Sequence, residues 1–161
     1  MGTIRRALQN TKLKKMILLI GLLWALLLSC GHAYQGYLGG NPNFVLCDGH
    51  MGTAWYVDRS SLVVGKYAPP QYILAVNVVT VHNADRGNTA IGGVRTMRYF
   101  YNSDLGQMYI DRNGNDDWRY LNPRGSWAET GVSMPAGEIA FALAYRMKFY
   151  GIYSDSFYDR I

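Results

Sequence analysis

Apolar and polar residues alternate through much of the chain after Thr53, which is the pattern of β-strands. The clearest run is Gln71–His82. One face of a strand over these residues would carry Tyr72, Leu74, Val76, Val78 and Thr80, and the other Ile73, Ala75, Asn77, Val79 and Val81. Because both faces are largely apolar, we predict a central strand that is covered on both sides or nearly so.

Shorter runs on either side predict further strands. They are Thr53–Asp58, Leu62–Val64, Ala90–Asn102, Gln107–Asp111 and Trp118–Leu121, with Phe44–Leu46 as a short edge strand. The connections are short and contain Gly, Asn and Asp, which favour turns. Short connections pair strands antiparallel, so we predict a meander of about six strands.

The period changes near the C-terminus, where Pro135–Tyr150 predicts a helix. Its apolar stripe would be Ile139, Ala140, Leu143, Ala144 and Met147. Glu138 suits the first turns of this helix, and Gly151 suits the position just after its end. The predicted fold class is therefore α+β, an antiparallel sheet flanked by one C-terminal α-helix.

The N-terminus has the three parts of a signal peptide. Residues 1–15 are basic, Met16–Leu28 is an uncharged run of 13 residues, and small residues follow up to Ala33. We expect cleavage after Ala33. The alternative is a lipoprotein signal of residues 1–29, with lipid attached to Cys30, because Leu27-Leu28-Ser29-Cys30 resembles a loose lipobox.

The predicted organisation has four parts: a signal peptide at 1–33, a Gly-rich linker or arm at 34–52, the sheet-and-helix domain at 53–151, and a tail at 152–161. This organisation predicts an exported protein of the periplasm, outer membrane or cell surface. Contact with the membrane is expected only through the signal peptide or a lipid anchor.

The formal charge of +5 is concentrated at the N-terminus. From Tyr34 onward the chain carries 11 basic and 11 acidic residues. Binding to nucleic acid depends on neutralising phosphates, so a neutral domain of this kind argues against a DNA or RNA partner.

Aromatic residues and arginines are the candidate contact residues, because Tyr, Trp and Arg are favoured at binding surfaces. We expect an exposed sheet face, with its neighbouring loops, to bind a protein or a glycan. The candidate binding residues are Arg95, Tyr99, Tyr101, Tyr109, Arg119 and Trp127.

The segment Asp111–Asp117 offers oxygen ligands at alternate positions, in Asp111, Asn113, Asn115 and Asp117, as a Ca²⁺ loop does. It does not match the EF-hand pattern, and a β-turn accounts for the same residues. We favour the turn and keep a Ca²⁺-dependent binder as an alternative.

Catalytic motifs are lacking in the sequence. After cleavage Cys47 is the only cysteine, and its neighbours Phe44, Val45 and Leu46 indicate burial. Cys47 with His50 is too small a set for a structural zinc site. We therefore predict no enzyme activity, no cofactor and no catalytic residues.

Several short motifs follow one another along the predicted domain: Trp55-Tyr56-Val57-Asp58, Ser60-Ser61-Leu62, the break at Tyr67–Pro70, the strand at Tyr72–Val81, Met108-Tyr109 and Trp118-Arg119-Tyr120. With the final helix, their order resembles the surface-adhesin protein E-like domain family and uncharacterised small exported proteins of diderm bacteria. The resemblance implies a six-stranded antiparallel sheet with a C-terminal helix, an envelope or surface location and, for the adhesin, binding of host matrix proteins. A lipid-anchored structural envelope protein without a soluble ligand is the alternative function.

Overall fold

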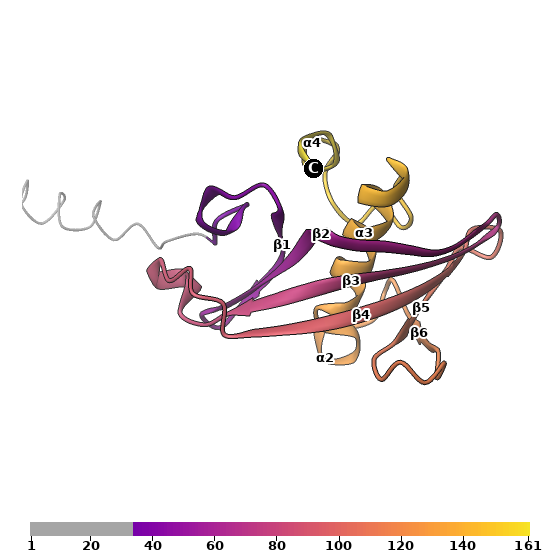
Figure 1. Ribbon diagram of the computed structural model, residues 1–161, viewed down its shortest axis with the longest axis horizontal. Coiled ribbons are helices and arrows are strands. Elements are labelled where there is room, and N and C mark those ends of the chain that lie inside the picture. The colour runs from indigo at the N-terminus through magenta and orange to yellow at the C-terminus, as the bar shows by residue number, and fades with distance from the viewer. Residues whose placement is uncertain (1–33) are drawn as a thin grey trace, which may run out of the picture. The chain divides into compact units, whose positions relative to one another are not determined.

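The computed structural model describes residues 34–161, so the predicted signal peptide and Cys30 lie outside the described part of the chain. Six antiparallel strands form one curled sheet in the order β1 to β6, which confirms the predicted meander and the broad α+β class (Figure 1). The strands are β1 (Phe44–His50), β2 (Thr53–Ala68), β3 (Gln71–Val81), β4 (Gly93–Asn102), β5 (Gln107–Asp111) and β6 (Arg119–Leu121).

Strand β2 is one long strand where the sequence suggested two strands with a turn between them. Its register against β3 shifts between Asp58 and Val63. The Oδ1 atom of Asp58 accepts a hydrogen bond from Ser60 N, and Ser61 Oγ accepts one from Asn77 N of β3. The polar residues that resemble a turn therefore form an irregularity within the strand, and β2 continues beyond it.

Helix α3 (Ser133–Tyr145) crosses one face of the sheet and contacts β1, β2 and β3 (Figure 1). Gly137 allows the closest approach, because a Cβ there would lie 2.5 Å from Met108 Sδ and 2.8 Å from the Tyr99 ring. Small Ala140 is buried as well, but Ala144 is only partly buried. The main core lies between α3 and this face of the sheet.

The helix ends at Tyr145, five residues before the predicted end at Tyr150. Arg146 takes a left-handed conformation, with φ 56°, and stops the helix. Glu138, expected in the first turns of the helix, is fully buried. Met147, predicted to belong to the apolar stripe, lies beyond the helix and is exposed.

The segments before and after the predicted domain are also folded against it. A 3₁₀ turn, η1 (Leu38–Gly40), precedes β1, and Val45 and Cys47 of β1 belong to the main core. At the other end, α4 (Asp155–Arg160) places Phe157 in the same core. The expected arm and tail are therefore part of the packed unit.

Two short helices complete the elements, η2 (Ala84–Arg86) after β3 and α2 (Trp127–Thr130) before α3. Within residues 34–161, no helix is both long enough and apolar enough to cross a lipid bilayer.

Candidate binding surfaces

A row of aromatic and apolar side chains crosses the sheet on the face away from α3. Ile73 of β3 pairs with Phe100 of β4, and Phe100 pairs with Tyr109 of β5. Tyr109 in turn pairs with Tyr120 of β6. The ring centroids are 5.7 Å apart between Phe100 and Tyr109, and 5.6 Å apart between Tyr109 and Tyr120. All four side chains are partly exposed, Tyr120 by 43%. We call Ile73, Phe100, Tyr109 and Tyr120 the aromatic row.

Trp118 and Arg98 border the aromatic row. The Trp118 ring lies 5.9 Å from that of Phe100, and the Arg98 guanidinium carbon lies 5.3 Å from the centre of the Trp118 ring. Arg98 also forms ion pairs with Asp111 at 2.7 Å and with Asp116 at 3.0 Å. A cation is thus held against an indole ring at the edge of a partly exposed aromatic surface.

Tyr99 and Tyr101 do not form an exposed face, so that expectation is wrong. Both are 0% exposed and lie on the α3 side of β4. The Tyr99 hydroxyl donates to Ser133 O at 2.9 Å, and the Tyr101 hydroxyl donates to Gly137 O at 2.8 Å. Burial raises the pKa of both phenols well above the usual value. They bind α3 to the sheet, because buried tyrosines need partners for their hydroxyls.

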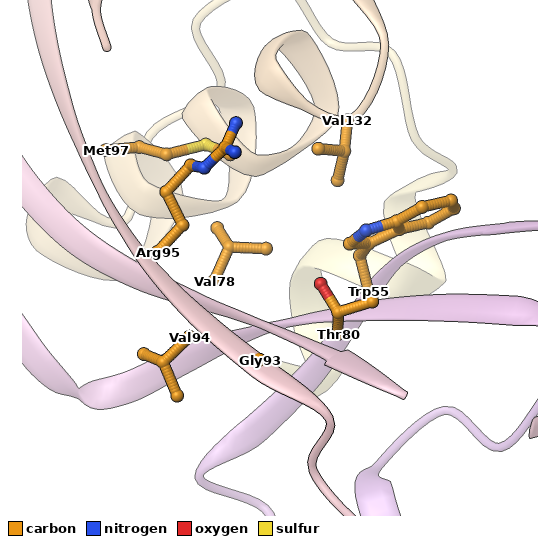
Figure 2. Close-up of a pocket in the computed structure, with 8 residues that line it drawn as sticks. All are labelled: Trp55, Val78, Thr80, Gly93, Val94, Arg95, Met97 and Val132. Atoms are coloured by element: carbon orange, nitrogen blue, oxygen red, sulfur yellow. The ribbon is translucent and has the colours of Figure 1, made fainter. Parts of the chain in front are cut away.

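Arg95 lies in a groove at the end of the sheet that α3 leaves uncovered (Figure 2). The groove has a volume of about 250 Å³ and is lined by Trp55, Val78, Thr80, Gly93, Val94, Arg95, Met97 and Val132. Figure 2 shows Trp55 and Arg95 on opposite sides of a floor made by Val78 and Thr80. The groove therefore offers an indole ring, a hydroxyl and a guanidinium around an apolar floor.

The other predicted contact residues lie apart from one another. Trp127 is 48% exposed, stacks on His50 with 4.5 Å between ring centroids, and donates from Nε1 to Asp48 Oδ2 at 2.7 Å. Its ring is 6.2 Å from that of Trp55 at the groove. Arg119 is exposed on the edge strand β6, where it pairs with Ile110. The six candidates thus divide among the core, the aromatic row, the groove end and the β6 edge.

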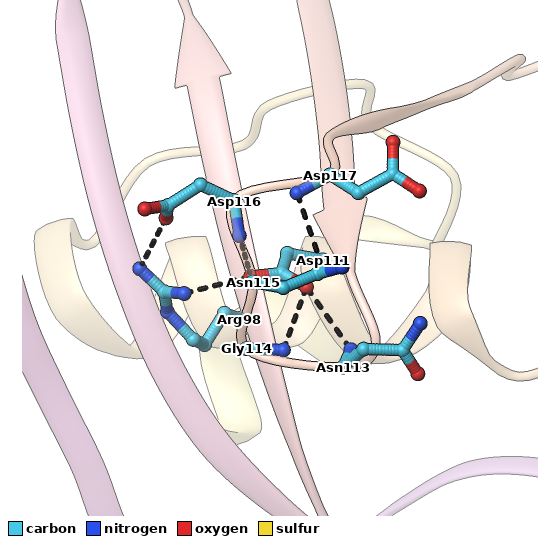
Figure 3. A network of polar contacts seen from close by, with 7 residues as sticks. All are labelled: Arg98, Asp111, Asn113, Gly114, Asn115, Asp116 and Asp117. Carbon is cyan, nitrogen blue, oxygen red and sulfur yellow. Dashed lines mark hydrogen bonds and ion pairs between the residues drawn. The ribbon is translucent and has the colours of Figure 1, made fainter.

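The loop after β5 is built around Asp111, whose carboxylate points inward (Figure 3). Its Oδ1 atom accepts hydrogen bonds from the backbone N–H groups of Asn113 and Gly114, and its Oδ2 atom accepts one from Asp116 N. Burial acts to raise the pKa of Asp111, but these backbone N–H groups together hold it below 3.8. This carboxylate orders the turn through hydrogen bonds to the backbone of its own loop.

Cys47 is buried, as its apolar neighbours indicated. Its thiol donates to Trp55 O at 3.1 Å, and burial raises its pKa far above that of a reactive thiol. His50 stacks on Trp127, and His82 Nδ1 lies 3.4 Å from Thr53 Oγ1. Among residues 34–161, no group of three or more His, Cys, Asp and Glu side chains is placed to hold a metal ion.

Sequence reasoning named Tyr109 but left Phe100, Trp118 and Tyr120 out of the candidate set. The alternation along β4 places Phe100 on the face opposite Tyr99 and Tyr101. What was missing was which face the helix covers, and no periodic pattern decides that. Once Tyr99 and Tyr101 are buried, Phe100 and its cross-strand neighbours lie on the open face.

Comparisons with known proteins give no relative for this chain. No family model, no curated protein and no solved structure matches it.

Proposed function

We propose that the protein is an exported, non-enzymatic binding module of the cell envelope or cell surface. It contacts a protein or glycan ligand through the aromatic row and the bordering residues Trp118 and Arg98. The observation that carries this proposal is the continuous register of Ile73, Phe100, Tyr109 and Tyr120 across four strands, on a face that α3 does not cover.

The chemistry of this face supports binding. An antiparallel sheet with one face on the core usually presents polar residues on the other face. Here Thr96 and Asn77 follow that rule, and Thr96 Oγ1 donates to Asn77 Oδ1 at 2.7 Å. Farther along the same face the residues become aromatic. Tyr and Trp give rigid contact area with a polar end, which suits both protein surfaces and the apolar faces of sugar rings.

The location is proposed from the N-terminal sequence, with its basic start, its apolar run and its small residues before Tyr34. The resemblance to the surface-adhesin protein E-like family supports an adhesin-like role, in which the ligand is a host matrix protein. The aromatic row is the surface that such a ligand would contact.

The test compares wild type with a Trp118→Ala, Tyr120→Ala double variant on immobilised extracellular matrix proteins and on a glycan array. We expect wild type to bind at least one ligand and the double variant to bind it at least about tenfold more weakly, because aromatic anchors carry much of a binding energy. The melting temperature should change little, since both side chains are partly exposed.

Tyr67→Ala is the matched control, because Tyr67 is 66% exposed and packs on Tyr72 and Tyr145 of the α3 side. It should bind like wild type. Equal binding by the double variant and wild type would refute the role of the aromatic row, and binding of nothing by wild type would refute the binding function.

A further inference from the structure

Half of strand β4 has a partner on one side only. Strand β3 pairs with β4 along its whole length, from Gly93 to Asn102. Strand β5 pairs with β4 only from Arg98 to Asn102. Among the described residues, Gly93–Met97 therefore has no strand along its outer side, and this half of β4 forms the lower border of the sheet in Figure 1.

This free edge is accessible. Gly93, Val94, Arg95 and Thr96 are all exposed. In an antiparallel strand every second residue directs its N–H and C=O away from the partner that it already has. Those groups can bind another extended chain, which makes a free edge a site for strand addition.

The groove lies next to this edge, on the α3 side of the same strand (Figure 2). Arg95 is its only charged lining residue, and no ion pair of Arg95 is present in the part of the chain that the structure describes. The lining contains no acidic side chain. The charge of the site therefore favours an acidic partner.

A second copy of this chain fits the edge poorly. If two such edges paired antiparallel about their centres, each Arg95 would lie directly opposite the other. Like charges directly opposite each other in a sheet are destabilising. A chain with a carboxylate at that place gains an ion pair and hydrogen bonds to the guanidinium.

From these observations we propose that the free edge of β4 at Gly93–Met97 binds an extended acidic peptide segment of another protein as an added antiparallel strand. The acidic side chain lies opposite Arg95. This site is separate from the aromatic row, and the inference goes beyond the proposed function.

The register of such a strand defines a probe peptide. Its residues pair in turn with Met97, Thr96, Arg95, Val94 and Gly93, and the sequence Leu-Thr-Glu-Val-Phe matches each of them. Leu lies beside Met97, Glu lies opposite Arg95, and Thr and Val face β-branched partners. Gly93 leaves room for the Phe ring to lean into the groove toward Trp55, because a Cβ at Gly93 would meet no atom within 4 Å.

The experiment titrates the full chain with this peptide, acetylated and amidated, and follows the backbone amide NMR signals of residues 93–97. We expect these signals to shift with a dissociation constant of about 1 mM, which is the affinity range of a short strand. Replacing Glu with Lys in the peptide should weaken binding at least about tenfold. The Arg95→Glu variant should reverse this preference, whereas Arg124→Glu, at an exposed loop arginine, should keep it.

N-methylation tests the strand geometry itself. One peptide carries methyl groups on the Thr and Val amides, and a second carries them on the Leu, Glu and Phe amides. Only one of these sets can point toward β4, so strand addition predicts that one peptide loses binding and the other keeps it. Equal effects of the two patterns would overturn the proposal.

Other occupants give different results. Shifts at Trp55 and Arg95 with glucuronate, but none with the peptide, would mean an acidic sugar site and would overturn the proposal. Concentration-dependent dimers that compete with the peptide for the β4 edge would assign this edge to a second copy of the chain. That result would also overturn the proposal. The Trp118→Ala, Tyr120→Ala variant should bind the peptide like wild type, so a failure of this proposal is distinct from a failure of the aromatic row.

Discussion

At the scale of single residues, Asp111 shows how a candidate ligand becomes a structural group. Its side chain is fully covered, it accepts three backbone N–H bonds from the loop after β5, and Arg98 Nη1 donates to it at 2.7 Å. The sequence favours a turn over a Ca²⁺ loop, although both use Asp and Asn at alternate positions. The inward direction of the Asp111 side chain depends on β4 beside it, because Arg98 of β4 donates to its carboxylate.

Asp111 should make the stability of the protein depend on pH in the acid range. Its pKa is lowered in the folded state, so the unfolded chain binds the proton more tightly. The stabilisation is complete above the unfolded value of 3.8 and is lost as the pH falls through the lower folded value. In urea unfolding, Asp111→Asn should be less stable than wild type at about pH 6, and the difference should shrink toward about pH 3.

Asp155→Asn is the control for this measurement. The hydrogen bond from Lys148 lowers the pKa of Asp155 as well, but this side chain is 86% exposed and water screens the pair. Its loss should change the stability little at any pH. A difference between wild type and Asp111→Asn that stays constant with pH would contradict the structural role of the carboxylate.

At the scale of elements, the alternation of residues predicted the meander and the two faces of β3 and β4. The positions that alternate in β3 and β4 do separate onto two sides, with Leu74 and Tyr99 on one and Ile73 and Phe100 on the other. The side that α3 would cover was not predictable, because Tyr99 and Phe100 are both large and apolar. The close approach at Gly137 marks the covered side, because it places Tyr99 and Met108 beneath the helix.

The end of α3 was mispredicted for a similar reason. Glu138 looked like a favourable charge near a helix start. Instead its carboxylate accepts hydrogen bonds from the backbone N–H groups of Phe149, Tyr150 and Gly151, and from the Tyr158 hydroxyl. These bonds hold the chain after Arg146 in a turn that folds back on the helix. The tertiary contact therefore overrides the local preference of this segment for helix.

Replacing Glu138 with Gln should destabilise the protein by roughly 1–3 kcal/mol, because a buried site that accepts four hydrogen bonds would then hold an amide with a single acceptor oxygen. The free energy of unfolding from urea denaturation measures this. Glu129→Gln on α2 is the matched control, at an exposed side chain, and should be close to neutral. Equal stability of Glu138→Gln and wild type would mean that the carboxylate does not hold the turn.

At the scale of the whole described unit, residues 34–43 and 152–161 meet beside strand β1. The Tyr153 hydroxyl donates to Cys47 O of β1 at 2.8 Å, and the Tyr37 hydroxyl donates to Arg160 O at 2.9 Å. Phe157 and Ile161 are buried in the main core. A Gly-rich arm and a short aromatic tail suggest two independent appendages, because neither shows a strong periodic pattern. Contacts between residues more than a hundred positions apart explain why both are ordered.

Deleting residues 152–161 should therefore open the core beside β1. Loss of the buried Phe157 and Ile161 side chains removes roughly 3–5 kcal/mol of stabilisation from apolar burial, which is a large part of the free energy of unfolding of a typical domain.

In a Cys30→Ser background Cys47 is the only remaining cysteine, so a thiol reagent such as dithionitrobenzoate reports directly on this region. The full-length chain should react slowly, because the thiol is buried and its pKa is raised, and the shortened chain should react much faster with a lower melting temperature. Phe157→Ala should give an intermediate rate, whereas Ser156→Ala, at an exposed neighbour on α4, should match the full-length chain. Equal rates in the full-length and shortened chains would show that the C-terminal segment does not close the core over β1.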